Sequence, residues 1–89
     1  MTEDTERVWL VERSYGQSED LVTLVYATTD GSLALKKQLS HNMLYGKTIT
    51  AAREQPRDEL DTVRDEETRT RYAEEATRMA GKHEPDDKV

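Results

Sequence analysis

The stretch LVTLVYATTDGSLALKKQLS, which begins at Leu21, constrains the fold more than any other part of the chain. Two runs rich in Val, Leu, Tyr and Thr flank the dipeptide Asp30-Gly31. Such a dipeptide between apolar runs is typical of a β-hairpin, because both central residues of a type I′ turn need a positive φ. We therefore predict an antiparallel hairpin with strands over residues 21–28 and 32–39 and a two-residue turn between them.

This turn sets a register that separates the hairpin residues into two faces. Tyr26 is expected opposite Leu35, and since side chains alternate along a strand, the larger apolar side chains then share one face. That face collects Val22, Leu24, Tyr26, Leu33, Leu35 and Leu39. We predict that it forms the core beneath a C-terminal helix.

Residues 7–15, RVWLVERSY, predict a strand that precedes the hairpin, because Val, Trp, Leu and Tyr are enriched in strands. The following loop, GQSED, carries no diagnostic turn signal. We prefer the pairing that places Trp9 opposite Tyr26, since it concentrates aromatic surface on one side. This pairing leaves Val8 and Leu10 on the second face of the sheet, together with Val25.

The remaining segments complete an α+β domain. Residues 47–52, KTITAA, are compatible with a short fourth strand. Pro56 and the acids after it suit the start of a helical region over about residues 56–80, in which Asp65 can cap a helix and Gly81 can end it. We predict one domain over residues 1–81: a three-stranded antiparallel meander in the order 1-2-3 with a C-terminal helix on one face. Residues 82–89 are expected to be a disordered acidic tail.

The composition limits the function classes. The chain has 89 residues, a net charge of −6 and no Cys, so neither disulfides nor thiolate metal sites are available. The acidic N-terminal residues include no apolar stretch, and no run approaches the roughly 18 apolar residues of a membrane span. We expect a cytoplasmic protein that does not bind a membrane.

Catalytic, cofactor and metal sites are not indicated. The two histidines, His41 and His83, stand far apart in the sequence, and the four glycines form no phosphate-binding loop. Ser40 and His41 are neighbours in the sequence, but adjacent side chains usually point apart. We expect a protein that is not an enzyme and that uses no cofactor or metal.

Two functional hypotheses remain. The second sheet face is partly apolar, and one helix covers only one face, so a protein partner or a second copy could dock on that face or on an exposed edge strand. The residues expected to take part are Val8, Leu10, Val25 and Lys36. Shielding of scattered apolar groups by lysine stems and threonine methyls explains the same pattern equally well. The alternative is a nucleic-acid accessory protein that uses Arg13, Lys36 and Lys37. It is less favoured, because residues 7–55 carry six basic and five acidic groups.

The segments VWLVER, LVYATTDG and RYAEEATRMA resemble an uncharacterised family of small acidic haloarchaeal proteins, a domain of unknown function. Eleven Thr, one Ile and more Arg than Lys fit the composition of salt-loving archaea, although an ordinary acidic protein from a GC-rich genome is the alternative. The resemblance implies a salt-adapted, cytoplasmic single domain. It supplies no catalytic or binding residues.

Overall fold

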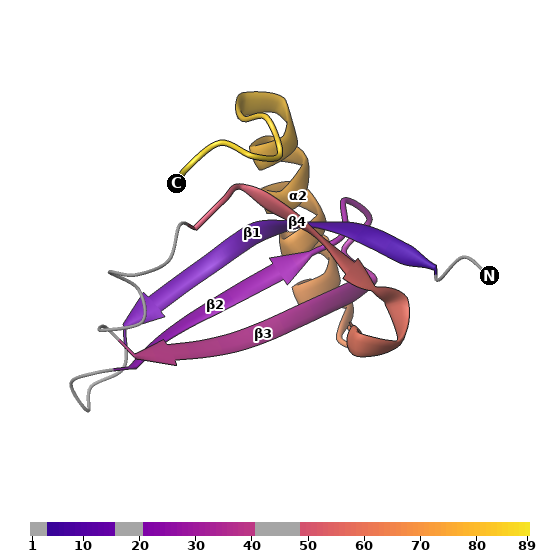
Figure 1. Cartoon of the computed structure of the whole chain (residues 1–89). Helices are drawn as coiled ribbons and strands as arrows, with labels where there is room; N and C mark the ends of the chain where they lie inside the picture. The colour runs from indigo at the N-terminus through magenta and orange to yellow at the C-terminus, as the bar shows by residue number, and fades with distance from the viewer. Residues whose placement is uncertain (1–3, 16–20, 41–48) are drawn as a thin grey trace.

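The computed structural model describes residues 4–15, 21–40 and 49–89 (Figure 1). Five antiparallel strands form one sheet in the order β4-β1-β2-β3-β5, and one α-helix packs on it. This is the predicted α+β fold, and the β1-β2-β3 meander order is confirmed. The elements are β1 (Thr5–Tyr15), β2 (Leu21–Ala27), β3 (Leu33–Ser40), β4 (Ala52–Pro56), the 3₁₀ helix η1 (Arg57–Glu59), β5 (Asp61–Thr62) and α2 (Glu66–Lys82).

The β2–β3 hairpin has the predicted register, with Tyr26 opposite Leu35. Its turn is longer than predicted. The Thr28 N–H donates to the Leu33 carbonyl at 3.0 Å and closes a loop over residues 29–32, and within it the Gly31 N–H donates to the Thr28 carbonyl. The Asp30 Oδ1 atom accepts hydrogen bonds from the Thr28 hydroxyl at 2.6 Å and from the Ser32 N–H at 3.0 Å. The register is the same as predicted because a two-residue loop and this four-residue loop both place Thr28 opposite Leu33.

The predicted pairing of β1 with β2 is wrong along all of β1, because the register is shifted by one residue before Val11 and by two residues after it. Ala27 lies opposite Trp9, and Tyr26 lies opposite Leu10. An irregularity between Leu10 and Glu12 leaves Val11 as an extra residue, as in a β-bulge. A shift of one residue reverses the faces, so the residues before Val11 face opposite to the prediction, whereas those after it face as predicted.

One side of the sheet, here called the Tyr26 face, carries the larger apolar cluster. Leu60 joins this cluster from the segment that runs from η1 to β5, and Leu33 and Leu35 pack against it. Because β4 and β5 lie at opposite edges of the sheet, this segment passes from one edge to the other. The buried cluster comprises Val8, Leu10, Val22, Leu24, Tyr26, Leu39 and Leu60.

The other side, here called the helix face, is covered by α2. Trp9 packs there with Ala51, Ala52 and Ala76, and Ala76 is the one buried residue of α2. The prediction that the helix covers the Tyr26 face is therefore wrong. The reason is close backbone approach: a Cβ atom at Gly31 would lie 2.1 Å from the Arg69 carbonyl oxygen of the helix. Figure 1 shows α2 crossing the strands on one side of the sheet.

The predicted helical region divides into parts. After η1 the chain returns to the sheet as β5, and α2 begins only at Glu66 with Asp65 as its N-cap, as the sequence allowed. The Asp65 Oδ2 atom accepts from the Thr68 N–H at 2.8 Å. Hydrogen bonds from the Thr68 side chain and backbone lower the pKa of Asp65. Gly81 does not end the helix, which continues to Lys82.

Backbone hydrogen bonds join the last residues of the chain to the segment before β4 and to its first residue. The sequence predicted a disordered acidic tail over residues 82–89. The Ala51 N–H donates to the Asp87 carbonyl at 2.8 Å, and the Ala52 N–H donates to the Pro85 carbonyl at 3.0 Å. Val89 packs against both apolar clusters. Because Ala51 and Ala52 are buried, the tail supplies acceptors that these N–H groups need. A fourth strand is present at Ala52–Pro56. Of the strand predicted over residues 47–52, residues 47 and 48 lie outside the described part of the chain.

Candidate functional site

The four residues predicted to form an interaction patch do not share a surface. Val8 and Leu10 lie in the cluster of the Tyr26 face, whereas Val25 alternates to the helix face. The exposed fractions of the three are 0%, 8% and 2%, so their side chains are part of the protein interior. Lys36 is exposed. The error follows from the shifted register of β1, which moved Val8 and Leu10 to the core.

The cations of the predicted nucleic-acid surface are also divided. Lys37 lies opposite Leu24 on the Tyr26 face, and Lys36 lies opposite Val25 on the helix face. Arg13 donates from Nη2 to the Val89 carbonyl at 3.2 Å. Trp9 and Tyr26, which were considered as stacking rings, are buried at 6% and 2% exposure. The structure therefore does not bring the three cations and the two rings onto one surface.

The outer edge of β3 is only partly paired within the described part of the chain. The two-residue strand β5 pairs with Leu33 and Ala34, and no other described strand lies beyond β3. Leu33 is hydrogen-bonded to Thr28 of the β2–β3 hairpin, and hydrogen-bonded and non-hydrogen-bonded residues alternate along an antiparallel strand. The backbone N–H and C=O groups of Lys36 and Gln38 therefore point away from β2. Both side chains are exposed. This edge offers backbone donors and acceptors to an added strand.

The charge around this edge differs from that of the whole chain. From Gly31 to Arg53 the sequence contains four basic residues and no Asp or Glu, while the chain as a whole has a net charge of −6. The basic residues of this acid-free stretch are Lys36, Lys37, Lys47 and Arg53. Lys36 and Lys37 lie on β3 itself, whereas Arg53 lies on β4. β3 thus carries two cations and no carboxylate, and Asp61 of β5 lies beside it, opposite Ala34.

A cavity of about 350 Å³ opens on the Tyr26 face. The Arg53 guanidinium carbon lies 5.6 Å from the centre of the Tyr26 ring, a cation–π arrangement. The described residues that line the cavity are Leu24, Tyr26, Lys37, Leu39, Ile49, Thr50 and Arg53.

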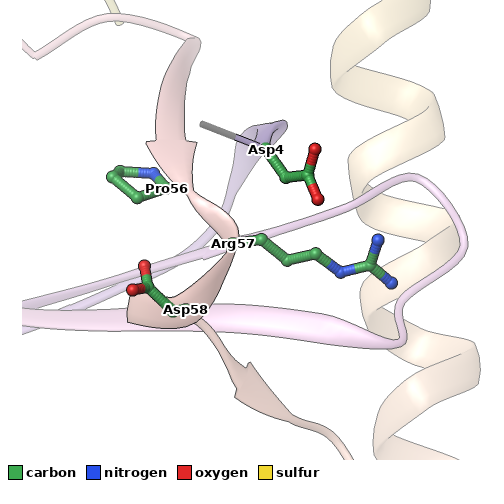
Figure 2. Close-up of a pocket in the computed structure, with 4 residues that line it drawn as sticks. All are labelled: Asp4, Pro56, Arg57 and Asp58. Carbon is green, nitrogen blue, oxygen red and sulfur yellow. The ribbon is translucent and has the colours of Figure 1, made fainter. Parts of the chain in front are cut away.

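A second recess, of about 390 Å³, lies where β1 begins and β4 ends (Figure 2), and it is lined by Asp4, Pro56, Arg57 and Asp58. Figure 2 shows the side chains of Asp4 and Arg57 on one side of the chain and those of Pro56 and Asp58 on the other. The Arg57 N–H donates to the Asp4 carbonyl at 2.9 Å, and Arg57 Nη1 lies 3.5 Å from a carboxylate oxygen of Glu6. These contacts join the strand ends, and the recess gathers no set of groups suited to catalysis.

Among residues 4–15, 21–40 and 49–89, no group of three or more His, Asp or Glu side chains is placed to hold a metal ion. Within these ranges, no helix is both long enough and apolar enough to cross a membrane.

Comparison with known proteins identifies a family. The model described as "Family of unknown function (DUF7967)" matches residues 2–89. The chain belongs to this family. The predicted resemblance to a domain of unknown function is thereby confirmed, and the DUF7967 match covers every element described above. No curated protein and no solved structure matches the chain.

Two features of the site were missed from the sequence. The acid-free stretch from Gly31 to Arg53 is visible in the sequence, but the charge count was made over residues 7–55, which also contain five acidic residues. The contact between Arg53 and Tyr26 had no sequence signal, because it depends on the pairing of β4 with β1.

Proposed function

We propose that the protein is a small non-enzymatic interaction module that binds an extended, acidic segment of a partner protein along the outer edge of β3. The observation that carries this proposal is the edge of β3 beyond Ala34, which pairs with no described strand and where Lys36 and Gln38 direct their backbone groups outward. Addition of a strand to an exposed edge is a common mode of peptide recognition, in which backbone hydrogen bonds provide affinity. Exposed edges also invite aggregation, and lysines on the edge limit it.

The charge of the edge favours an acidic partner over a second copy of the chain. Two β3 strands paired edge to edge would bring the lysines of both copies together, and like charges in cross-strand positions are destabilising. An extended partner that alternates acidic and apolar residues avoids this repulsion. Lys36 would attract its carboxylates, and its backbone would complete the ladder.

A designed peptide of alternating Val and Asp residues tests the proposal. We expect saturable NMR shift changes in the amides of residues 34–39 when the peptide is added to the ¹⁵N-labelled protein. Gln38→Pro should abolish these changes, because proline removes an outward N–H and is tolerated on a strand edge. Gln38→Ala keeps the N–H and should bind as the wild type does. Binding that is equal for both variants would overturn the edge site.

Lys36 and Lys82 are both exposed, so substitutions at these two lysines test whether the charge at the β3 edge contributes to peptide binding. Lys36→Glu should weaken peptide binding at least tenfold, whereas Lys82→Glu on α2 should leave it unchanged. A protein that binds a single-stranded DNA oligonucleotide but not the peptide, and loses this binding in Lys36→Glu with Lys37→Glu, would support the nucleic-acid alternative instead. A concentration-dependent dimer that disappears in Gln38→Pro would replace the partner with a second copy.

We also infer a cytoplasmic protein adapted to high salt, of the haloarchaeal type that the sequence resembles. The net charge of −6 supports this inference, as does the concentration of exposed acids on α2, among them Glu66, Glu67 and Glu74. Salt screens repulsion between such charges. The urea midpoint should therefore rise between low salt and molar KCl, and a midpoint that does not depend on salt would contradict the inference.

A further inference from the structure

Arg53 holds an unusual position over the Tyr26 face. Its side chain is half-buried, and its guanidinium lies over the ring of Tyr26, 5.6 Å from the ring centre. The backbone of Arg53 pairs with Val8 of β1, whereas its side chain makes no ion pair or hydrogen bond with any residue that the structure describes. A guanidinium has five N–H donors in a planar fork that matches carboxylate and phosphate groups.

Tyr26 adds a second donor without a partner. The residue is 2% exposed, and within the described part of the chain its hydroxyl has no hydrogen-bond partner. Among the described residues, no buried side-chain nitrogen or oxygen atom lacks a hydrogen-bond partner, so the Tyr26 hydroxyl keeps contact with solvent in the cavity, where a ligand can reach it. Both Tyr26 and Arg53 line the cavity on this face.

The lining of the cavity has one sign of charge. Lys37 and Arg53 are its charged residues among those described, and no described carboxylate lines it. Most of the described lining residues come from the acid-free stretch between Gly31 and Arg53, which explains why the lining contains no described carboxylate. An anion at the Arg53 guanidinium therefore meets no competing carboxylate from the described part of the chain.

The size and the walls of the cavity indicate what the anion carries. Its volume of about 350 Å³ lies at the lower end of the roughly 300–1,000 Å³ of small-molecule sites. Leu24, Leu39 and Ile49 supply apolar walls. A bare inorganic ion would leave these walls in contact with water, whereas a compact organic group would cover them.

We propose that this cavity binds a small organic anion, either a carboxylate or a phosphate monoester. The charged group lies on the Arg53 guanidinium and accepts from the Tyr26 hydroxyl, and the apolar body packs against Leu24 and Leu39. The site is separate from the β3 edge and does not depend on it.

NMR titration of the ¹⁵N-labelled protein tests the site with three probes of similar shape: phenyl phosphate, benzoate and benzyl alcohol. We expect saturable shifts at Leu24, Tyr26, Leu39 and the Arg53 Nε–H with at least one of the two anions. The anion that binds more tightly defines the class of ligand. Equal binding of benzyl alcohol would mean that the cavity recognises only apolar surface, and it would overturn the proposal.

Two variants separate recognition from folding. Arg53→Gln should weaken binding of the anion at least tenfold, whereas Arg64→Gln, which removes an exposed arginine before α2, should not change it. Tyr26→Phe keeps the ring and removes only the unpartnered hydroxyl, so binding should weaken several-fold without loss of stability. The proposal is overturned if no probe gives saturable shifts at tens of millimolar, or if Arg53→Gln and Tyr26→Phe both bind as the wild type does.

Discussion

The two faces of the sheet are buried in different ways. On the Tyr26 face, large side chains such as Leu24, Tyr26 and Leu39 fill the space. On the helix face, Trp9 packs among the alanines at positions 51, 52 and 76. The comparison teaches that a helix with a narrow apolar stripe can still dock when small residues let the backbones approach. The Tyr26 face should therefore be sensitive to the loss of side-chain volume, and the helix face to its addition.

Close approach of the helix is most pronounced at Gly31. This residue has a φ of 73°, and a Cβ atom there would lie 2.1 Å from the Arg69 carbonyl oxygen and 2.9 Å from the Ala73 nitrogen. The Thr77 hydroxyl donates to the Thr29 carbonyl at 3.4 Å beside it. The hairpin turn is thus a docking point for α2 as well as a connection between strands.

Gly31→Ala should have the largest effect on stability. The substitution strains a left-handed backbone and places a methyl group against helix backbone that cannot yield, so we expect a loss of about 4 kcal/mol in the free energy of unfolding. Urea unfolding followed by circular dichroism measures it. Gly81→Ala is the matched control, because a Cβ there meets nothing within 4 Å. It should stabilise the exposed helix by about 0.5–1 kcal/mol. Similar outcomes for the two variants would contradict the docking of α2 on the turn.

Leu24→Ala tests the Tyr26 face. Leu24 is 1% exposed, and truncation of a buried leucine leaves a cavity that costs about 3 kcal/mol. The same urea experiment with Leu21→Ala provides the control. Leu21 lies on the same strand but is 41% exposed, so its truncation should cost less than about 1 kcal/mol. Equal losses would show that the Tyr26 face is not the main apolar core.

Ala76→Leu tests the helix face in the opposite direction. Ala76 is fully buried beside Trp9 and Ala52, and added methyl groups in a packed site cost about 2 kcal/mol. Ala80→Leu places the same change on an exposed position of α2 and should stay within about 0.5 kcal/mol of the wild type. A stabilised Ala76→Leu variant would mean that the helix face is loosely packed and would remove the contrast between the faces.

Asp30→Asn should give the smallest effect, and one that depends on pH. Hydrogen bonds from the Thr28 side chain and from the backbone and side chain of Ser32 lower the pKa of Asp30 below its ordinary 3.8. The ionised carboxylate therefore stabilises the turn above that value, and this contribution disappears as the pH falls through the lowered pKa.

The difference in urea midpoint between the wild type and Asp30→Asn measures this contribution. It should be present at neutral pH and shrink toward zero below pH 3.8. Asp65, whose pKa is also lowered, is common to both proteins and does not alter the difference. A difference that stays constant across this range would show that the Asp30 charge does not stabilise the turn.

The sequence predicted the elements whose determinants are local. The hairpin register followed from the Asp30-Gly31 turn and the alternation of apolar residues, and the cap at Asp65 followed from the acid before α2. For the candidate site, Lys36 was identified as a surface residue, whereas Val8, Leu10 and Val25 were assigned to a surface that does not exist. The contact between the helix and β1 had no local signal: Arg71 Nη2 lies 3.5 Å from a carboxylate oxygen of Glu12.

The tertiary structure alone decided the face on which the helix packs, the bulge at Val11 and the edge at which the tail binds. Each depends on contacts between segments far apart in the chain: Gly31 with Arg69, Leu10 with Tyr26, and Ala51 with Asp87. Local patterns report which residues turn, alternate or cap, because these preferences act within a few residues. They do not report which surfaces meet, since that outcome depends on how closely distant backbones can approach and on which buried N–H groups still need an acceptor.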